Sequence, residues 1–280
     1  MKDIKLIAFD LDFTILDKDK KLSSENIRAL EAARERGIEI VPATGRQYNN
    51  IPEGLKSMCR YLILINGAAV YDSLEDRYLY EAPLKTELAL GILKHGDTLP
   101  CLYDCYTREE AFMNEDMLAV LDDYMPDPNY VKTMKSKRRP VPELKEHIIN
   151  SGSPIYKLQY YFRRPEEREE QLKRLDEKFP GRLYVSTSLQ TNIEINSAAG
   201  IKGKALEVLC SSLGFGLENA VAFGDGSNDL SMIQMAGTGV CLRNGAKVCL
   251  EAADIITRYD CNESGFGREL MSLMNYQENR

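Results

Sequence analysis

The sequence predicts an α/β protein in which an inserted α+β domain separates the two halves of a parallel-sheet core. Three observations predict this fold class. Apolar runs of strand length alternate with helical stretches at both ends of the chain, the middle has a different pattern, and 280 residues exceed one small domain. Strands that are apolar on both faces and alternate with helices are typical of parallel sheets with right-handed crossovers.

The N-terminal flank shows this alternation most clearly. Strands are expected at residues 4–9, 38–41 and 61–65. A helix between the first two strands is expected to begin at Ser23 or Ser24 and to end at Gly37. Serine is favoured as an N-cap and glycine just beyond a helix C-terminus, so these residues define the helix bounds.

The C-terminal flank repeats the same order of elements. Helices are expected at residues 204–213, 229–235 and about 263–274, and strands at 220–223, 239–242 and 255–256. We expect both flanks to contribute to one sheet, so that residues 1–84 and 188–280 form a discontinuous α/β core.

Residues 85–187 between the flanks differ in texture. Helical stretches at 85–93 and 166–178 enclose alternating segments such as Ile155–Phe162. Alternation with a period of two predicts an antiparallel sheet with one covered face. We therefore predict an inserted α+β domain here, and we interpret the basic run Lys132–Arg139 as a solvated loop.

The charge balance and the rarity of histidine exclude several classes of function. Lys plus Arg total 36 against 43 Asp plus Glu, a net charge of −7, which disfavours nucleic acid as a partner. His95 and His147 are the only histidines. This scarcity disfavours a hydrolase with a Ser-His-Asp triad and a metal site built from several histidines. No run of about 18 apolar residues is present, so no membrane-spanning helix is expected.

The seven cysteines and the N-terminus bear on the cellular compartment. Seven is an odd number, and the apolar run in MKDIKLIAFDLD is too short for a signal peptide. We therefore expect a cytoplasmic protein whose thiols stay reduced.

Polar side chains follow several of the predicted strands, where ligands bind in doubly wound sheets. They are Asp10, Asp12, Thr44, Asn66, Asp225, Asn228 and Asp229. Carboxylates this close repel one another by about 4 kcal/mol per pair at about 4 Å. A cation must offset that repulsion, and hard oxygen ligands favour Mg²⁺. Asp10 and Asp12 lie two residues apart, so in an extended segment both carboxylates face one side.

Three further stretches carry residues suited to a ligand site, the first two to an anion. Thr44-Gly45-Arg46 supplies a hydroxyl, an accessible N–H and a cation, although an ordinary N-cap is the favoured interpretation of this stretch by itself. Lys202 and Lys204 stand at a helix start, where the helix dipole disfavours cations, so a phosphate there would explain them. The stretch from Gly224 to Asp229 (GDGSND) combines a tight turn with acidic groups.

Taken together and in this order, four segments resemble the signature motifs of the haloacid dehalogenase superfamily: residues 10–14 (DLDFT), 43–46 (ATGR), 201–204 (IKGK) and 224–229 (GDGSND). The large insertion is similar to the cap of the Cof-like phosphatase branch. Shorter matches are Asn66-Gly67-Ala68, Glu194-Ile195, residues 253–257 and Gly265-Phe266. The resemblance implies a Rossmann-like core with a substrate-selecting cap, and a Mg²⁺-dependent phosphatase of small phosphorylated metabolites, sugar phosphates above all.

The resemblance also implies a role for each motif residue. Asp10 would be the nucleophile that forms an aspartyl-phosphate, and Asp12 the general acid and base. Mg²⁺ would be held by Asp10, Asp225 and the Asp12 backbone carbonyl. The phosphoryl oxygens would be bound by Leu11, Thr44, Gly45, Lys202 and Asn228. Asp229 would orient Lys202, while Arg46 and Asn66 are further candidates for contact with substrate.

Phe13 departs from the family pattern, because glycine is usual between the second Asp and the Thr of the first motif. A bulky ring beside the site would narrow the space for the leaving group. The choice of Lys202 over Lys204 rests on the glycine that follows it, Gly203.

Other functions stay open on the sequence alone. A phosphosugar mutase shares the motifs but returns the phosphoryl group to its substrate. A dehalogenase needs the first Asp but neither the second nor the metal. A receiver-like signalling module needs its acceptor Asp after the third strand, where this chain has Asn66. A catalytically inactive scaffold would have no need for all four motif acids. The expected partner is a small-molecule phosphate ester, and the protein is a monomer or a homodimer.

Overall fold

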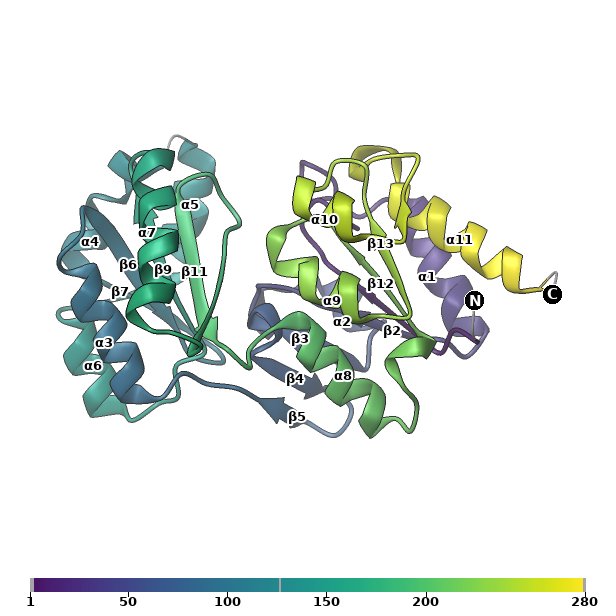
Figure 1. Cartoon of the computed structure of the whole chain (residues 1–280), viewed down its shortest axis with the longest axis horizontal. Helices are drawn as coiled ribbons and strands as arrows, with labels where there is room; N and C mark the ends of the chain where they lie inside the picture. The colour runs from purple at the N-terminus through teal and green to yellow at the C-terminus, as the bar shows by residue number, and fades with distance from the viewer. Residues whose placement is uncertain (1–2, 126, 279–280) are drawn as a thin grey trace. The chain divides into compact units, whose positions relative to one another are not determined.

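A computed structural model describes residues 3–125 and 127–278, with side chains to residue 275. The chain divides into two compact units (Figure 1). The core unit comprises Met1–Arg46, Asn50–Glu81 and Ile201–Arg280, and the inserted unit comprises Gln47–Asn49 and Ala82–Gly200. Among the helices of the described ranges, no candidate for a bilayer-spanning segment is found.

The core unit is built on a five-stranded sheet in the order β14-β13-β12-β1-β2. Its strands are β1 (Leu6–Phe9), β2 (Glu39–Pro42), β12 (Ala220–Gly224), β13 (Thr238–Cys241) and β14 (Ile255–Ile256). All four pairings between neighbours are parallel. Because β1 pairs with β12, the two ends of the chain form one sheet, and the predicted discontinuous parallel sheet is confirmed.

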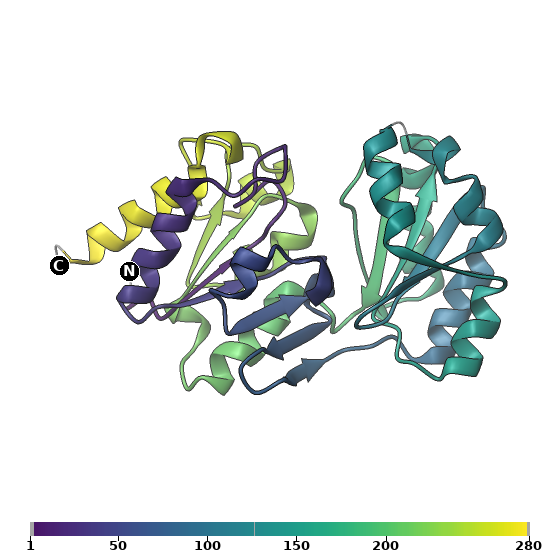
Figure 2. The ribbon, with the colours of Figure 1, turned by 180° about the vertical axis from the view of Figure 1, so that it is seen from behind.

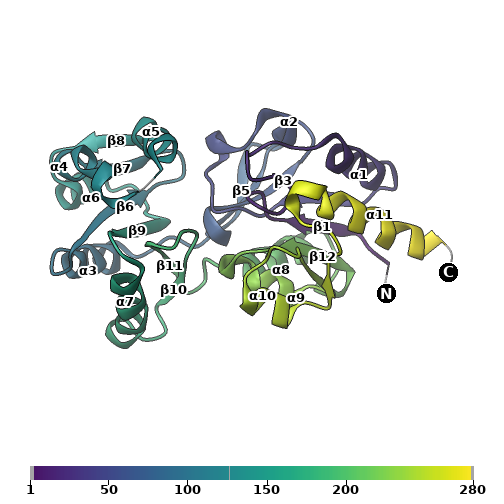
Figure 3. The same cartoon turned by 90° about the horizontal axis from the view of Figure 1, so that it is seen from above.

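Helices cover both faces of this sheet (Figure 3). They are α1 (Ser24–Glu35) and α11 (Gly265–Glu278) on one face, and α8 (Lys202–Ser212), α9 (Leu230–Met235) and α10 (Lys247–Ala252) on the other. Leu6 and Ala8 of β1 pack with Leu206 of α8. On the opposite face the Phe266 ring of α11 contacts the rings of Phe9 and Phe223, at centroid distances of 5.3 and 4.8 Å. Burial on both faces explains why these strands are continuously apolar.

The N-terminal helix has the predicted bounds. Ser23 is the N-cap of α1 and its side chain accepts a hydrogen bond from the Asn26 N–H at 3.1 Å. Gly37 follows the helix with φ of +73°, a conformation that glycine adopts without strain. Figure 2 shows α1 beside α11.

The third predicted strand forms, but in a different sheet. β3 (Tyr61–Leu64), β4 (Ala69–Asp72) and β5 (Arg77–Glu81) form a separate antiparallel sheet. A tight turn at η2 (Ile65–Gly67) sends the chain back along β3, so β4 becomes its partner. β3 touches the parallel sheet through one parallel bridge between Ala43 and Ile63.

The inserted unit contains a six-stranded sheet in the order β10-β11-β9-β6-β7-β8, antiparallel except for the β7–β8 pair. The strands are β6 (Cys101–Tyr106), β7 (Ala111–Asn114), β8 (Arg138–Val141), β9 (Lys157–Phe162), β10 (Leu183–Ser186) and β11 (Asn192–Ser197). The helices are α3 (Thr86–Gly96), α4 (Glu115–Ala119), α5 (Pro128–Ser136), α6 (Leu144–Ser151) and α7 (Pro165–Lys178). The short helix α2 (Glu53–Lys56) lies in the core unit.

The prediction of one covered face is wrong for the centre of this sheet. Every residue of β6 and β9 is buried. Leu158, Tyr160 and Phe162 join an apolar cluster on one face. The other face buries Asp104, which accepts hydrogen bonds from Tyr161 at 2.8 Å and from Arg138 at 3.0 Å. Polar residues alternate along β9 because they form this internal network, not because they face water.

The same network corrects the interpretation of the basic run Lys132–Arg139. This run is not a solvated loop, because it spans the end of α5 and the start of β8. The Arg138 guanidinium is nearly fully buried against Asp104. A run of like charges therefore contains one residue with an internal ionic partner.

The boundaries of the compact units differ from those predicted at residues 85 and 187. β11 pairs with β9 and β10, which places residues 188–200 in the inserted unit. The Leu84 N–H bonds to the Ile155 carbonyl at 2.7 Å, which ties the other connection to the same unit. All seven cysteines are buried and free.

Candidate active site

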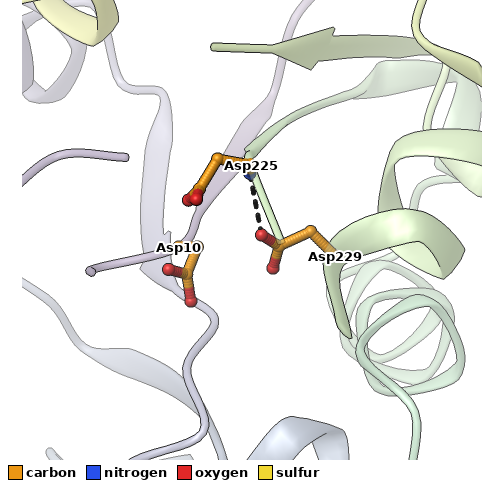
Figure 4. A group of neighbouring side chains, drawn as sticks. All are labelled: Asp10, Asp225 and Asp229. Atoms are coloured by element: carbon orange, nitrogen blue, oxygen red, sulfur yellow. Dashed lines mark hydrogen bonds between the residues drawn. The ribbon is translucent and has the colours of Figure 1, made fainter. Parts of the chain in front are cut away.

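Two carboxylates stand at the ends of adjacent parallel strands in the core unit. Phe9 of β1 is in register with Phe223 of β12, and Asp10 and Asp225 follow those two strands. Among the described residues, Asp10, Asp225 and Asp229 form a group whose oxygens lie within 4.8 Å of one another (Figure 4). The structure therefore brings together three of the four predicted acids.

Lys202 binds two of these carboxylates. Its Nζ donates to Asp10 Oδ1 at 2.6 Å and to Asp229 Oδ1 at 2.5 Å, and its side chain is fully buried. Lys202 is the first residue of α8. Lys204 instead forms an exposed pair with Glu207 at 2.6 Å. Of the two candidate lysines, Lys202 is therefore the one beside Asp10.

A close backbone contact fixes the start of α8. Gly67 has φ of +95°, and a Cβ built there would lie 2.2 Å from the Ile201 carbonyl carbon and 2.5 Å from the Lys202 nitrogen. Only glycine allows this approach. The resemblance of Asn66-Gly67 to the family sequence thus has a physical reason. The turn after β3 packs against Ile201, the residue that precedes Lys202.

The other oxygen of Asp229 closes the turn after β12. Asp229 Oδ2 accepts hydrogen bonds from the backbone N–H groups of Asp225 and Gly226, both at 2.9 Å. A Cβ at Gly224 would lie 2.4 Å from the Asp229 Cβ. Asp229 is fully buried, so its carboxylate simultaneously positions Lys202 and the segment that carries Asp225.

Asp12 has its own set of partners. Its Oδ1 and Oδ2 accept from Arg46 Nη2 at 2.6 Å and Nε at 2.9 Å, and Lys20 Nζ lies 2.8 Å from Oδ1. Burial alone would raise the pKa of Asp12, but these two cations lower it to about 2. The segment after Asp10 is a turn, closed by the Leu16 N–H to the Leu11 carbonyl at 2.9 Å, and is not the extended segment that we expected.

The predicted phosphate-binding residues surround the ends of these strands. Thr44 is buried and follows β2, and its hydroxyl accepts from the Arg46 N–H at 3.2 Å. Asn228 Nδ2 donates to Asn66 Oδ1 at 3.1 Å, which joins two motifs distant in sequence. Leu11 is fully buried directly after Asp10, and Gly45 is half-buried directly after Thr44.

Two residues near the site were absent from our predicted set. Thr14 Oγ1 donates to Asp225 Oδ1 at 2.6 Å and thereby links the first and fourth motifs. Its place in the first motif was a usable signal. Lys20 bonds to Asp12, yet it lies in a run of charged residues that gives no hint of an internal contact.

The electrostatics of this group call for a cation. Burial raises the pKa of Asp10, the neighbouring Asp229 and Asp12 raise it further, and Lys202 opposes them. Burial and the Asp229 and Asp10 carboxylates raise the pKa of Asp225 well above its usual value. The single ammonium of Lys202 does not offset three carboxylates, whose hard oxygen ligands fit a divalent cation such as Mg²⁺.

A doubly wound parallel sheet with this acidic group at its carboxyl edge defines an α/β enzyme whose chemistry rests on carboxylates. The sequence pattern of the haloacid dehalogenase-like hydrolases matches residues 7–270. The chain therefore belongs to the haloacid dehalogenase-like hydrolases, in their Cof-like phosphatase branch, and is an enzyme. Four motifs that the sequence alone suggested thus identified the family correctly.

Relatives of known name extend this similarity along nearly the whole chain. The 5-amino-6-(5-phospho-D-ribitylamino)uracil phosphatase YcsE of Bacillus subtilis (strain 168) is 30% identical over 258 residues, covering 91% of this chain and 90% of the relative. Phosphatase YwpJ of the same organism is 28% identical, covering 91% and 94%. A haloacid dehalogenase-like hydrolase from B. subtilis superposes with a TM-score of 0.83 at 27% identity, covering 96% of this chain and 99% of that structure.

Proposed function

We propose that this protein is a Mg²⁺-dependent phosphatase that hydrolyses small phosphorylated metabolites through an aspartyl-phosphate on Asp10. One observation carries the proposal: Asp10, Asp225 and Asp229 lie within 4.8 Å of one another around the buried ammonium of Lys202. A nucleophilic carboxylate beside two further acids can attack a dianionic phosphate only if cations neutralise the site.

The metal would be held by the carboxylates of Asp10 and Asp225 and by the backbone carbonyl of Asp12. Mg²⁺ bound there would neutralise the approaching phosphoryl oxygens and act as a Lewis acid. Asp229 is less suited to the metal, because its two oxygens already accept from Lys202 and from two backbone N–H groups. Thr14 holds Asp225 through one carboxylate oxygen.

The reaction would proceed in two displacements at phosphorus. In the first, an Asp10 oxygen bonds to phosphorus as the ester P–O bond breaks, and Asp12 protonates the leaving oxygen. In the second, Asp12 takes a proton from the water that attacks the aspartyl-phosphate, which releases phosphate and restores Asp10. Lys202, Thr44, Asn228 and the N–H groups of Leu11 and Gly45 would stabilise the phosphoryl oxygens.

The partners of Asp12 suit one of its two roles as they stand. With Arg46 and Lys20 both bound, the pKa of Asp12 near 2 keeps it ionised, as the base of the second displacement requires. To donate a proton in the first displacement, the carboxylate must leave these cations. Asp12 would therefore change partners between the two steps.

The substrates would be small phosphate monoesters, with sugar phosphates and related compounds as the favoured class. The name of the relative YcsE specifies a phosphorylated ribityl compound, which supports this class. The inserted unit would act as the cap that selects among substrates. Excision of residues 82–200 should spare small aryl phosphates and remove discrimination among larger ones, whereas unchanged selectivity would contradict the role of this unit.

The cellular setting that we propose is the cytoplasm, where seven buried, unpaired thiols stay reduced. The protein would act there as a monomer or a homodimer on small-molecule phosphate esters.

A phosphosugar mutase is the closest alternative, because it would use the same nucleophile and metal. A phosphate-release assay across a panel of metabolite monophosphates, with and without Mg²⁺, separates the two. We expect stoichiometric release of inorganic phosphate that EDTA abolishes and added Mg²⁺ restores. Conversion of a phosphosugar to its isomer without phosphate release would favour the mutase, and full activity in EDTA would contradict the metal requirement.

A further inference from the structure

Phe13 has an unfavourable backbone conformation and an exposed side chain. It directly follows Asp12 and has φ of +63°, in the left-handed region where glycine is the unstrained residue. Its side chain is not part of a core, because 41% of the residue surface is exposed. Strained residues that contribute nothing to packing are concentrated at functional sites. The strained backbone and the exposed ring beside Asp12 point to a role at the adjacent site.

Two contacts within the core unit hold this residue, one from Asn244, which is distant in sequence, and one from the nearby Lys20. The Asn244 side chain donates to the Phe13 carbonyl at 2.9 Å, which fixes the backbone. The ammonium of Lys20 lies over the ring, 3.9 Å from its centroid. An ammonium at this distance is attracted to the electron-rich face of the ring.

Lys20 itself is presented by an ordered turn. Its φ is +61°, the second left-handed non-glycine conformation in this short segment. Asp17 Oδ1 accepts hydrogen bonds from the Asp19 and Lys21 N–H groups, both at 2.8 Å, and this turn carries Lys20 between them. The segment is thus folded so that one ammonium meets both the Phe13 ring and the Asp12 carboxylate.

These contacts place the ring close to the Asp12 carboxylate. Lys20 Nζ is 2.8 Å from Asp12 Oδ1 and 3.9 Å from the Phe13 ring centroid. Asp12 is the residue that would protonate the leaving oxygen in the proposed reaction. An exposed aromatic surface beside that residue would meet the first atoms of a leaving group.

We propose that Phe13 is a specificity-determining residue that favours phosphate monoesters whose leaving group carries a flat apolar ring next to the ester oxygen. The Lys20 ammonium lies over one face of this ring. The proposal rests on the proposed phosphatase function and deepens it, since it names the part of the substrate that this residue selects. Contact between two rings removes apolar surface from water and aligns their electrostatic edges and faces.

The test compares two activated phosphate compounds, p-nitrophenyl phosphate, which has a ring at the ester oxygen, and acetyl phosphate, which has none. Both have good leaving groups, so we expect a working phosphatase site to cleave both. The readout is the ratio of their kcat/KM values, which cancels effects common to both compounds. The variants are Phe13→Gly, Phe13→Ala and Phe13→Tyr, and the matched control is Leu74→Ala, another exposed apolar residue of the core unit.

We expect the ratio to fall about fivefold in Phe13→Gly and equally in Phe13→Ala, because both lose the ring. It should stay within about twofold of the wild-type ratio in Phe13→Tyr and Leu74→Ala. Glycine relieves the backbone strain and alanine retains it, so a fall in only one of the two variants would assign the effect to the backbone and overturn the proposal.

A wild-type ratio in both ring-free variants would also overturn the role of Phe13 while leaving the phosphatase function intact. Wild-type protein that cleaves neither compound in the presence of Mg²⁺ would instead overturn the proposed function on which this inference depends.

Discussion

Arg46 holds the Asp12 carboxylate with two parallel hydrogen bonds, from Nη2 at 2.6 Å and from Nε at 2.9 Å. A planar guanidinium matches a carboxylate in this way, and such a bidentate pair fixes orientation as well as charge. Arg46 Nη1 also donates to the Asn50 carbonyl at 3.0 Å, which anchors the arginine to the chain. Arg46 of the second motif thus orients Asp12, the second acid of the first motif.

Replacing Arg46 by methionine should make the free energy of unfolding vary less with pH in the acid range. The fold lowers the pKa of Asp12 from 3.8 to about 2, so the ionised carboxylate stabilises the folded state. This contribution to the free energy of unfolding is complete above about pH 3.8, the pKa in the unfolded chain, and is lost as the pH falls towards about 2. With the carboxylate about one-third exposed, we expect Arg46→Met to lose about 1 kcal/mol more of the free energy of unfolding at about pH 7 than at about pH 3.

Urea denaturation of wild type and Arg46→Met at both pH values measures this difference. Lys204→Met removes an exposed pair with Glu207 and serves as the control, whose free energy of unfolding should stay close to the wild-type value at both pH values. An equal loss for Arg46→Met at both pH values would contradict the lowered pKa of Asp12.

Alanine at Gly67 should destabilise the core unit and displace Lys202. The added Cβ would lie 2.2 Å from the Ile201 carbonyl carbon, in addition to the strain at φ of +95°. We expect a loss of about 3 kcal/mol or more in the free energy of unfolding, and reduced activity in the folded fraction. Gly214→Ala is the matched control, because Gly214 has φ of +81° but nothing near its Cβ position. That change should lose only about 1 kcal/mol, and equal losses would show that the contact with Ile201 is unimportant.

The two lysines of the third motif should differ sharply. Lys202→Met leaves the buried carboxylates of Asp10 and Asp229 without their ammonium, which should lower the free energy of unfolding by about 3 kcal/mol and kcat/KM by about a hundredfold or more. Lys204→Met should leave both quantities nearly unchanged. Thermal denaturation and phosphate release measure the two effects, and a larger loss of activity in Lys204→Met would mean that the assignment is reversed.

Much of the core could be predicted from the sequence because its rules are local. Ser23 and Gly37 mark the ends of a helix by their own preferences, and the apolar run before Asp10 marks a buried strand. The acids at the strand ends follow from the rule that parallel strands end at one edge. For the same reason Asp10 and Asp225 could be expected to meet.

Other features depend on contacts that no local pattern records. Period-two alternation in β9 indicated a solvated face, yet Asp104 and Arg138, distant in sequence, neutralise each other under that face. Lys20 reaches Asp12 only because a turn at Asp17 presents it. The prediction that β3 joins the parallel sheet was wrong because the chain reverses directly after it. Two consecutive residues in the left-handed conformation, Ile65 and Asn66, make this turn, and neither is a glycine.

Asp10→Asn removes the proposed nucleophile while keeping its size. We expect the rate of phosphate release to fall by at least about a thousandfold, because an amide oxygen does not form a stable bond to phosphorus here. The fold should persist, since the amide still accepts a hydrogen bond from Lys202. Retention of more than about a tenth of the wild-type rate would contradict covalent catalysis.

The central claim is that Asp10 carries the phosphoryl group during turnover, and chemical trapping tests it most directly. Wild-type protein is quenched during turnover of a substrate with Mg²⁺, and borohydride is added to reduce any aspartyl-phosphate to homoserine. Peptide mass spectrometry then identifies the reduced residue. We predict homoserine at position 10 that depends on both substrate and Mg²⁺. Unmodified Asp10 during active turnover, or reduction at another aspartate, would contradict the account.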